Sequence, residues 1–293
     1  MPPALLRLRY LAEYGAFGVL AAFVRGLPVE RASGLSGAVW RAVAPRLSRH
    51  RRALAHLAAA FPDKSDAERD AIARDMWEML GRTFAEAFHL DRILEDDRID
   101  FAPAETYEAI RARAAGGEGA VVASLHSGNW ELTAAGARPA GLTIAGVYQA
   151  IKNPYVDAYV TRRRAPLEPG GLRPRVPATA TALMRFAKRG GGVALLADLR
   201  DRNGVAVAYF GRPAPSTIFP ALLARSLDLR MYAARVVRLP GVRFRIEVVE
   251  LPIPRVGERK ADVADATQML QSQFESWVRE NPSQWMWAHR RWG

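Results

Sequence analysis

The pattern of hydrophobic and polar positions changes near residue 99. Before it, residues 14–24 form an uncharged apolar run, residues 28–40 follow as a helical segment that begins with proline, and residues 66–89 carry apolar side chains at helical spacing. The last of these segments is preceded by a capping-box pattern that starts at Ser65, and such a pattern is typical of a helix start. The first hundred residues are therefore predicted to be mostly helical.

After residue 99, short apolar runs rich in β-branched residues alternate with helical patterns. Strands are expected at residues 120–124, 142–148, 193–197, 205–210, 229–238 and 244–249, and helices at residues 106–115, 130–137, 153–164, 179–189, 217–226 and 262–280. This alternation predicts an α/β fold with a mostly parallel sheet covered by helices on both faces. Functional side chains are expected at the carboxyl ends of its strands.

The first buried strand of this series is followed by the strongest candidate for chemistry. His126 comes directly after the strand at 120–124, and Glu131 lies in the first turn of the next helix, with Ser127 or Asn129 as its N-cap. We expect the tight turn to bring the Glu131 carboxylate onto the imidazole, which would fix His126 as a general base. The alternative is a histidine that is only a satisfied polar residue. No nucleophile-elbow pattern is present, so the expected task is to deprotonate a substrate hydroxyl.

Composition narrows the classes of partner. The 293 residues are 49% hydrophobic, contain no cysteine, and have histidines at no metal-ligand spacing, so we expect neither a metal nor another cofactor. The net charge is +12, and the basic residues are mostly arginine. Such a chain is expected to meet an anionic partner, which could be a phospholipid surface, a phosphorylated substrate, an acidic carrier protein or a nucleic acid.

The N-terminal segment suggests contact with a membrane. Its uncharged run of eleven residues is shorter than the roughly 20 that a spanning helix needs. No clear signal-peptide cleavage site follows, so we expect an uncleaved interfacial helix, with an ordinary core helix as the open alternative. A basic run at residues 45–56 is expected to be either a membrane-surface patch or a solvated helix face. The predicted organisation is a membrane-associating helix at 1–27 and one larger domain at 28–293, helical over 28–98 and α/β over 99–293.

Several blocks of sequence, taken in order, resemble a known family. The block from His126 to Glu131 is similar to the His-x4-acid block of glycerolipid acyltransferases. The later blocks resemble the bacterial lipid A biosynthesis acyltransferases, which include lauroyl and myristoyl transferases. These blocks are Val147-Tyr148, Lys152 to Pro154, Arg162 to Arg164, Leu195 to Asp198, Phe210 to Ala214 and Asn281 to Trp292. The resemblance runs from about Arg46 to the end. It departs from the family at Leu199, where glutamine usually follows the aspartate.

The resemblance implies a fold similar to that of glycerol-3-phosphate acyltransferase, and it also implies an acyltransferase function. It implies transfer of a fatty acyl chain from an acyl carrier protein or acyl-CoA thioester to a hydroxyl of an anionic glycolipid, at the cytoplasmic face of the inner membrane. His126 would be the base and Glu131 would stabilise its imidazolium. The residues expected to bind substrate are Asn129, Arg163, Arg164 and Asp198.

Two other functions remain open from the residues alone. The acceptor could be another phospho- or glycolipid, such as a phosphatidylinositol mannoside, with acyl-CoA as donor. The chain could also be a basic nucleic-acid-binding protein, although its arginines are scattered and no recognition module is present, so we expect no nucleic-acid partner. The tryptophans at 285, 287 and 292 could lie at a membrane interface or pack on the protein core.

Overall fold

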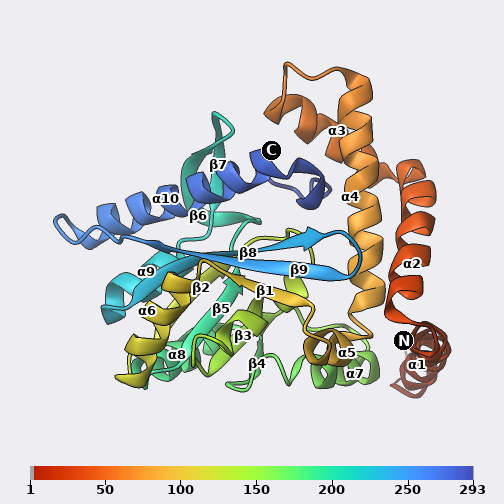
Figure 1. Ribbon diagram of the computed structural model, residues 1–293, viewed down its shortest axis with the longest axis horizontal. Coiled ribbons are helices and arrows are strands. Elements are labelled where there is room, and N and C mark those ends of the chain that lie inside the picture. The colour runs from red at the N-terminus through yellow and green to blue at the C-terminus, as the bar shows by residue number, and fades with distance from the viewer. Residues whose placement is uncertain (1–2, 293) are drawn as a thin grey trace.

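The computed structural model describes residues 3–292. Its N-terminal part is a layer of helices at one end of the molecule (Figure 1). These elements are α1 (Pro3–Gly26), α2 (Val29–Val43), η1 (Ala44–Arg46), α3 (Ser48–Ala60), α4 (Asp66–Glu86) and α5 (Leu90–Glu95). The predicted capping box is confirmed, because the Ser65 hydroxyl accepts from the Glu68 N–H and the Glu68 carboxylate accepts from the Ser65 N–H. The prediction of a mostly helical first hundred residues is therefore confirmed.

The remaining chain forms a sheet with helices on both faces, as the alternating pattern predicted. The strands are β1 (Ile99–Ala102), β2 (Ala120–Ser124), β3 (Ile144–Tyr148), β4 (Leu172–Pro174), β5 (Gly192–Leu196), β8 (Arg230–Leu239) and β9 (Arg243–Leu251), in the order β1-β9-β8-β2-β5-β3-β4. Neighbouring strands are parallel except β8 and β9, which form an antiparallel pair. A separate antiparallel pair, β6 (Arg200–Tyr209) and β7 (Arg212–Ser216), projects from this sheet.

The sheet separates two apolar cores. One core contains side chains from α8 (Pro177–Lys188), α9 (Phe219–Leu227) and α10 (Arg259–Glu280), and it continues into α3, α4 and the C-terminal tryptophans. The other contains side chains from α5, α6 (Ala104–Ala115) and η2 (Trp130–Ala137). The remaining elements are α7 (Pro154–Arg164) and η3 (Pro282–Gln284). Burial on both faces explains why the central strands read as continuous apolar runs.

The strand order determines where the functional groups meet. β2 and β5 are parallel neighbours, and Ser124 pairs with Leu196 at their carboxyl ends. The chain then continues from both strands at the same edge of the sheet, and the Ala197 N–H donates to the Ser124 carbonyl at 2.8 Å. Residues two positions beyond each strand, His126 and Asp198, are thereby brought side by side.

Helix α1 is longer than the apolar run at 14–24 and lies against α7. The Asn153 side chain donates to the Tyr10 carbonyl at 2.9 Å, and the rings of Phe17 and Tyr159 meet edge to face. Among residues 4–26 of this helix, only Ala21 is buried, so α1 is not an ordinary core helix. Within residues 3–292, none of the helices has the length and apolar character needed to cross a bilayer.

Candidate active site

His126 and Asp198 form a hydrogen-bonded pair at the carboxyl edge of the sheet. The His126 Nδ1 lies 2.8 Å from one Asp198 oxygen, and the His126 backbone N–H donates to the other oxygen at 2.9 Å. An ionised carboxylate only accepts hydrogen bonds, so this contact assigns the proton to Nδ1 and leaves a lone pair on Nε2. The imidazole is 12% exposed, which makes it reachable, whereas the carboxylate is 1% exposed. This is the arrangement of an oriented general base.

Asp198 is kept ionised by its partners. Burial by itself raises the pKa of the Asp198 carboxyl, but the charge and hydrogen bonds of His126 outweigh burial and lower that pKa overall. The indole N–H of Trp285 also donates to this carboxylate, at 2.9 Å. Asp198 was predicted to bind substrate. Its burial and its three donors instead make it the acidic partner of His126.

Glu131 does not fold back onto His126, so that prediction of contact is wrong. Its carboxylate accepts two hydrogen bonds from the Arg164 guanidinium, at 2.5 and 2.6 Å. The reason lies in the local structure: residues 130–137 form a 3₁₀ helix, not the expected α-helix, and α7 ends with Arg164 opposite Glu131. A guanidinium fork matches a carboxylate better than a single imidazole N–H does. Glu131 and Arg164 therefore form a bridge between η2 and α7 beside the site.

Asn129 was also predicted to bind substrate, and the structure gives its side chain another partner. The Asn129 side chain is fully buried, and its Nδ2 donates to Glu86 at 2.9 Å. Glu86 on α4 is fully buried too and receives a two-pronged contact from Arg238 on β8, at 2.7 and 2.6 Å. This network ties the turn after His126 to the helical layer and to the sheet, so the Asn129 side chain anchors the turn.

Arg163 points away from the dyad. It donates to Asp91 at 3.1 Å, and its guanidinium lies over the Tyr159 ring. Asp91 also pairs with Arg25 of α1, and this pairing lowers the pKa of the Asp91 carboxyl to about 2. The predicted substrate contact of Arg163 is therefore replaced by a link between α5, α7 and α1.

The turn after His126 is held by the C-terminal segment. The Gly128 N–H donates to the Gln284 carbonyl at 3.0 Å, and the Met286 N–H donates to the His126 carbonyl at 3.1 Å. Gly128 has a positive φ of 56°, and a Cβ there would lie 2.1 Å from the Val236 carbonyl oxygen, so no larger residue fits. The C-terminal segment thus shapes the candidate site directly.

Two further aromatic rings enclose the imidazole. His289 packs on His126 with ring centroids 4.7 Å apart, and Trp130 meets it edge to face at 5.2 Å. Burial, together with the charge of His126, lowers the pKa of the His289 imidazole to about 4. His289 is therefore neutral at neutral pH and adds no positive charge beside the base.

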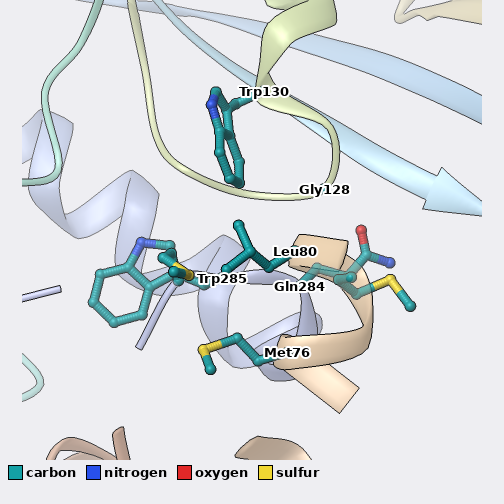
Figure 2. A pocket seen from close by; sticks show the side chains of 8 residues that line it. Met76, Leu80, Gly128, Trp130, Gln284 and Trp285 are labelled. Carbon is teal, nitrogen blue, oxygen red and sulfur yellow. The ribbon is translucent and has the colours of Figure 1, made fainter. Parts of the chain in front are cut away.

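A closely packed apolar crevice, which has no room for a ligand as it stands, adjoins the dyad (Figure 2). Figure 2 shows Leu80 of α4 pointing toward the turn at Gly128 and Trp130, with Trp285 beside Leu80 and Met76 farther from the turn. The full lining is Met76, Met79, Leu80, Gly128, Trp130, Gln284, Trp285 and Met286. Trp130 also packs on His126, and Trp285 also contacts Asp198. The walls of the crevice are therefore parts of the catalytic geometry.

The sequence interpretation missed Trp285, His289, Glu86 and Arg238 as members of the site. Trp285 and Trp287 are buried, as the core-docking alternative predicted. The available signal for Trp285 and His289 was their place in the C-terminal block that resembles the family. Glu86 and Arg238 gave no local signal. In the described part of the chain, no three His, Asp or Glu side chains are grouped as metal ligands would be.

Comparison with known proteins identifies the family. The whole chain, residues 1–293, matches the family model described as bacterial lipid A biosynthesis acyltransferase. A search of curated proteins finds no significant match. The match to the family model identifies the α/β protein as an acyltransferase. More particularly, the chain belongs to the bacterial lipid A biosynthesis acyltransferase family.

Proposed function

We propose that this acyltransferase moves a fatty acyl chain from an acyl carrier protein thioester to a hydroxyl of a lipid A precursor. The observation that carries the proposal is the His126–Asp198 pair, which holds an oriented, partly exposed imidazole at the edge of the sheet. The donor can equally be acyl-CoA, and the acceptor another phospho- or glycolipid, because both alternatives use the same chemistry.

His126 acts as the base of the transfer. Its Nε2 takes the proton of the acceptor hydroxyl while that oxygen attacks the thioester carbonyl carbon. The tetrahedral intermediate then breaks its C–S bond, and the departing thiolate takes the proton from the imidazolium. Asp198 keeps the imidazole in the required tautomer and stabilises its positive charge, which is the role first assigned to Glu131. A positioned base of this kind contributes roughly 10²–10⁴ in rate.

The developing oxyanion needs donors near the carbonyl carbon. The first N–H groups of η2, at Trp130 and Glu131, precede the intrahelical hydrogen bonds of that 3₁₀ helix and lie beside the dyad. They can donate to the oxyanion. The Glu131–Arg164 bridge fixes the wall of the site that η2 and α7 share, and it places a guanidinium at that wall for an anionic acceptor.

The crevice beside the dyad has no free space for an acyl chain as it stands, so side chains must move apart when the donor binds. The crevice between α4 and the active-site turn is lined by three methionines, whose flexible side chains adapt to a hydrocarbon chain. Transfer at the cytoplasmic face of the inner membrane is part of the proposal. The net charge of +12 suits both an acidic carrier protein and an anionic lipid surface.

Lipid analysis tests the function. Total lipids from cells that lack the gene are compared by mass spectrometry with lipids from cells in which the gene, or its His126→Ala variant, is restored. We expect one lipid A species to gain the mass of one acyl chain with the wild-type gene only. Unchanged lipid A with a mass shift in another glycolipid would replace the acceptor, and restoration by the variant would remove His126 as base.

A further inference from the structure

Helix α2 exposes an apolar stripe on its outer face. Leu35, Val39 and Val43 are 53, 51 and 50% exposed, and Ala38 and Ala42 between them are exposed as well. These five positions recur at spacings of three and four residues, so they share one face of the helix. Figure 1 shows α2 on the far side of α4 from the sheet, at the edge of the molecule.

The inner face of α2 packs against α4 through both polar and apolar contacts. Ser33 donates to the buried Glu86 at 2.7 Å, and Ser36 donates to the Gly81 carbonyl at 2.6 Å. A Cβ at Gly81 would lie 2.6 Å from the Ser36 carbonyl oxygen, so α2 and α4 are in close backbone contact. Surface helices usually place their polar residues outward. The inner face of α2 also buries Val29 and Ala32 and stacks Trp40 on α4, so α2 carries apolar side chains on its outer face in addition to those that it packs inward.

The stripe belongs to a larger exposed apolar region. In the described part of the chain, ten of the fifteen large apolar side chains that are exposed lie between residues 5 and 47. They are Leu5, Leu8, Leu11, Val19, Leu20, Phe23, Leu35, Val39, Val43 and Leu47. Single exposed apolar residues are ordinary, but a contiguous concentration marks an interaction surface. The α2 stripe is thus continuous in sequence with the exposed face of α1.

The charge of the same segment indicates what covers it. Residues 1–52 contain nine arginines and only two glutamates, which is +7 of the +12 net charge of the chain. The stripe runs between Arg31 and Arg46, and Arg49 and Arg51 follow on α3. All four are exposed, and none of them forms an ion pair within residues 3–292. A second copy of the chain would bring two such positive segments together, whereas an anionic lipid leaflet attracts them.

We propose that the outer face of α2 is a membrane-docking surface, which inserts Leu35, Val39 and Val43 into the interface of an anionic leaflet beside α1. This inference rests on the proposed function, because a lipid acceptor requires the enzyme to reach a bilayer. It assigns the contact to a helix that has no long apolar run and places the flanking arginines at the headgroups.

Vesicle binding of the full chain tests the surface. The probe is a vesicle of phosphatidylethanolamine and phosphatidylglycerol, and the variant is Val39→Glu. Its matched control is Val176→Glu, because Val176 is also 50% exposed but precedes α8 and belongs to neither α1 nor α2. We expect Val39→Glu to lower the vesicle partition coefficient about tenfold or more, since a carboxylate resists entry into the interface, and Val176→Glu to leave it unchanged.

A milder double variant, Leu35→Gln with Val39→Gln, introduces no charge and is therefore less prone to misfold. It should also lower the vesicle partition coefficient. Equal binding of wild type and both α2 variants would overturn the proposal. A concentration-dependent dimer in sedimentation that Val39→Glu abolishes would also overturn it, in favour of a second copy.

The assay of acyl transfer separates this inference from the proposed function. With detergent-dispersed acceptor, Val39→Glu should retain the wild-type rate, and with acceptor in vesicles it should lose rate in proportion to binding. If Val39→Glu loses vesicle binding while even the wild type transfers no acyl chain, the membrane-docking proposal is supported and the proposed function is wrong. If transfer occurs from vesicles and Val39→Glu matches the wild type, the surface fails alone.

Discussion

Asp198 carries most of the catalytic geometry at the scale of single residues. Its carboxylate is nearly inaccessible and accepts hydrogen bonds from both the backbone and the ring of His126 and from the indole of Trp285. An oriented base requires that its acidic partner not rotate. Two donors from His126 set the distance, and the third donor restrains rotation of the carboxyl group. Trp285 is therefore a positioning residue for the base.

Replacing Trp285 by phenylalanine removes this third donor while it retains an aromatic ring. We expect kcat for acyl transfer to fall about 10- to 100-fold with KM changing much less, because phenylalanine keeps an aromatic ring in the wall of the crevice. The control is Trp287→Phe, since the indole N–H of Trp287 donates to the Pro282 carbonyl and not to the dyad. Steady-state kinetics with both variants measure the effect. Equal, small losses in the two would show that Trp285 only fills space.

The sequence allowed His126 to be predicted but assigned its partner wrongly. The sequence predicts a strand, a turn and a helix start around His126, because these local structures depend on neighbouring residues. Asp198 lies 72 positions away and meets His126 only because β5 inserts beside β2. Spacing along the chain favours the nearest acid, Glu131, but gives no information about strand order. The later block that ends at Asp198 was noted, yet its contact depends on that order.

Between elements, the Glu131–Arg164 bridge joins η2 to the end of α7. The side chains of Glu131 and Arg164 are 12 and 27% exposed, so this ion pair is less exposed to solvent than a typical surface pair. Loss of one partner leaves the other charge half-buried and uncompensated. The bridge therefore acts as a unit that fixes the wall of the site.

A double-mutant cycle measures the energetic coupling between Glu131 and Arg164. We expect Glu131→Gln and Arg164→Gln each to lower kcat/KM by about tenfold or more, and the double variant to be no worse than either single variant. The control cycle uses Arg230 and Glu250, an ion pair in which both side chains are more exposed. Its coupling should be small. Additive losses for Glu131 and Arg164 would mean that each contacts substrate independently.

Glu168, four residues after Arg164, couples the same region to pH. Burial raises the pKa of its carboxyl from 4.5 to about 7, although the charge of Arg164 opposes the shift. The folded protein therefore holds a proton between these values that the unfolded chain has lost. Stability from this group is present below about pH 4.5 and is lost as the pH rises through about 7.

Glu168→Gln should remove this dependence. Urea unfolding at pH 5 and pH 8 should show that the wild type loses more free energy of unfolding than the variant over this range, by on the order of 3 kcal/mol or less. The comparison isolates Glu168, because the histidines titrate alike in both proteins. Parallel changes in the two proteins would contradict a raised pKa.

Element types were largely predictable, and the exceptions have physical causes. The helices and longer strands followed from periodicity. β1 and β4 contain only four and three residues, too few to show a period. Residues 130–137 form a 3₁₀ helix because of tertiary contacts that their side chains make, such as that of Glu131 with Arg164. The expected strand at 205–210 is one half of the longer β6–β7 hairpin.

For the whole molecule, function depends on how the helical layer, the sheet and the C-terminal segment hold the dyad. The buried Glu86–Arg238 pair joins the first two, and Gln284 joins the third to the turn after His126. The α/β class and the helical layer could be predicted from the sequence, but these joints could not, because each one links residues far apart in the chain. The account therefore rests on a tertiary pair rather than on a local motif.

The rate of acyl transfer by purified Asp198→Asn protein tests this account most directly. Wild type and variant are incubated with an acyl carrier protein thioester and a lipid A precursor that has free hydroxyls, and the products are followed by mass spectrometry. We predict that the wild type adds one acyl chain and that the folded variant does so at least about 100-fold more slowly, because amide in place of carboxylate no longer stabilises the imidazolium. Transfer by the variant at the wild-type rate would contradict the account.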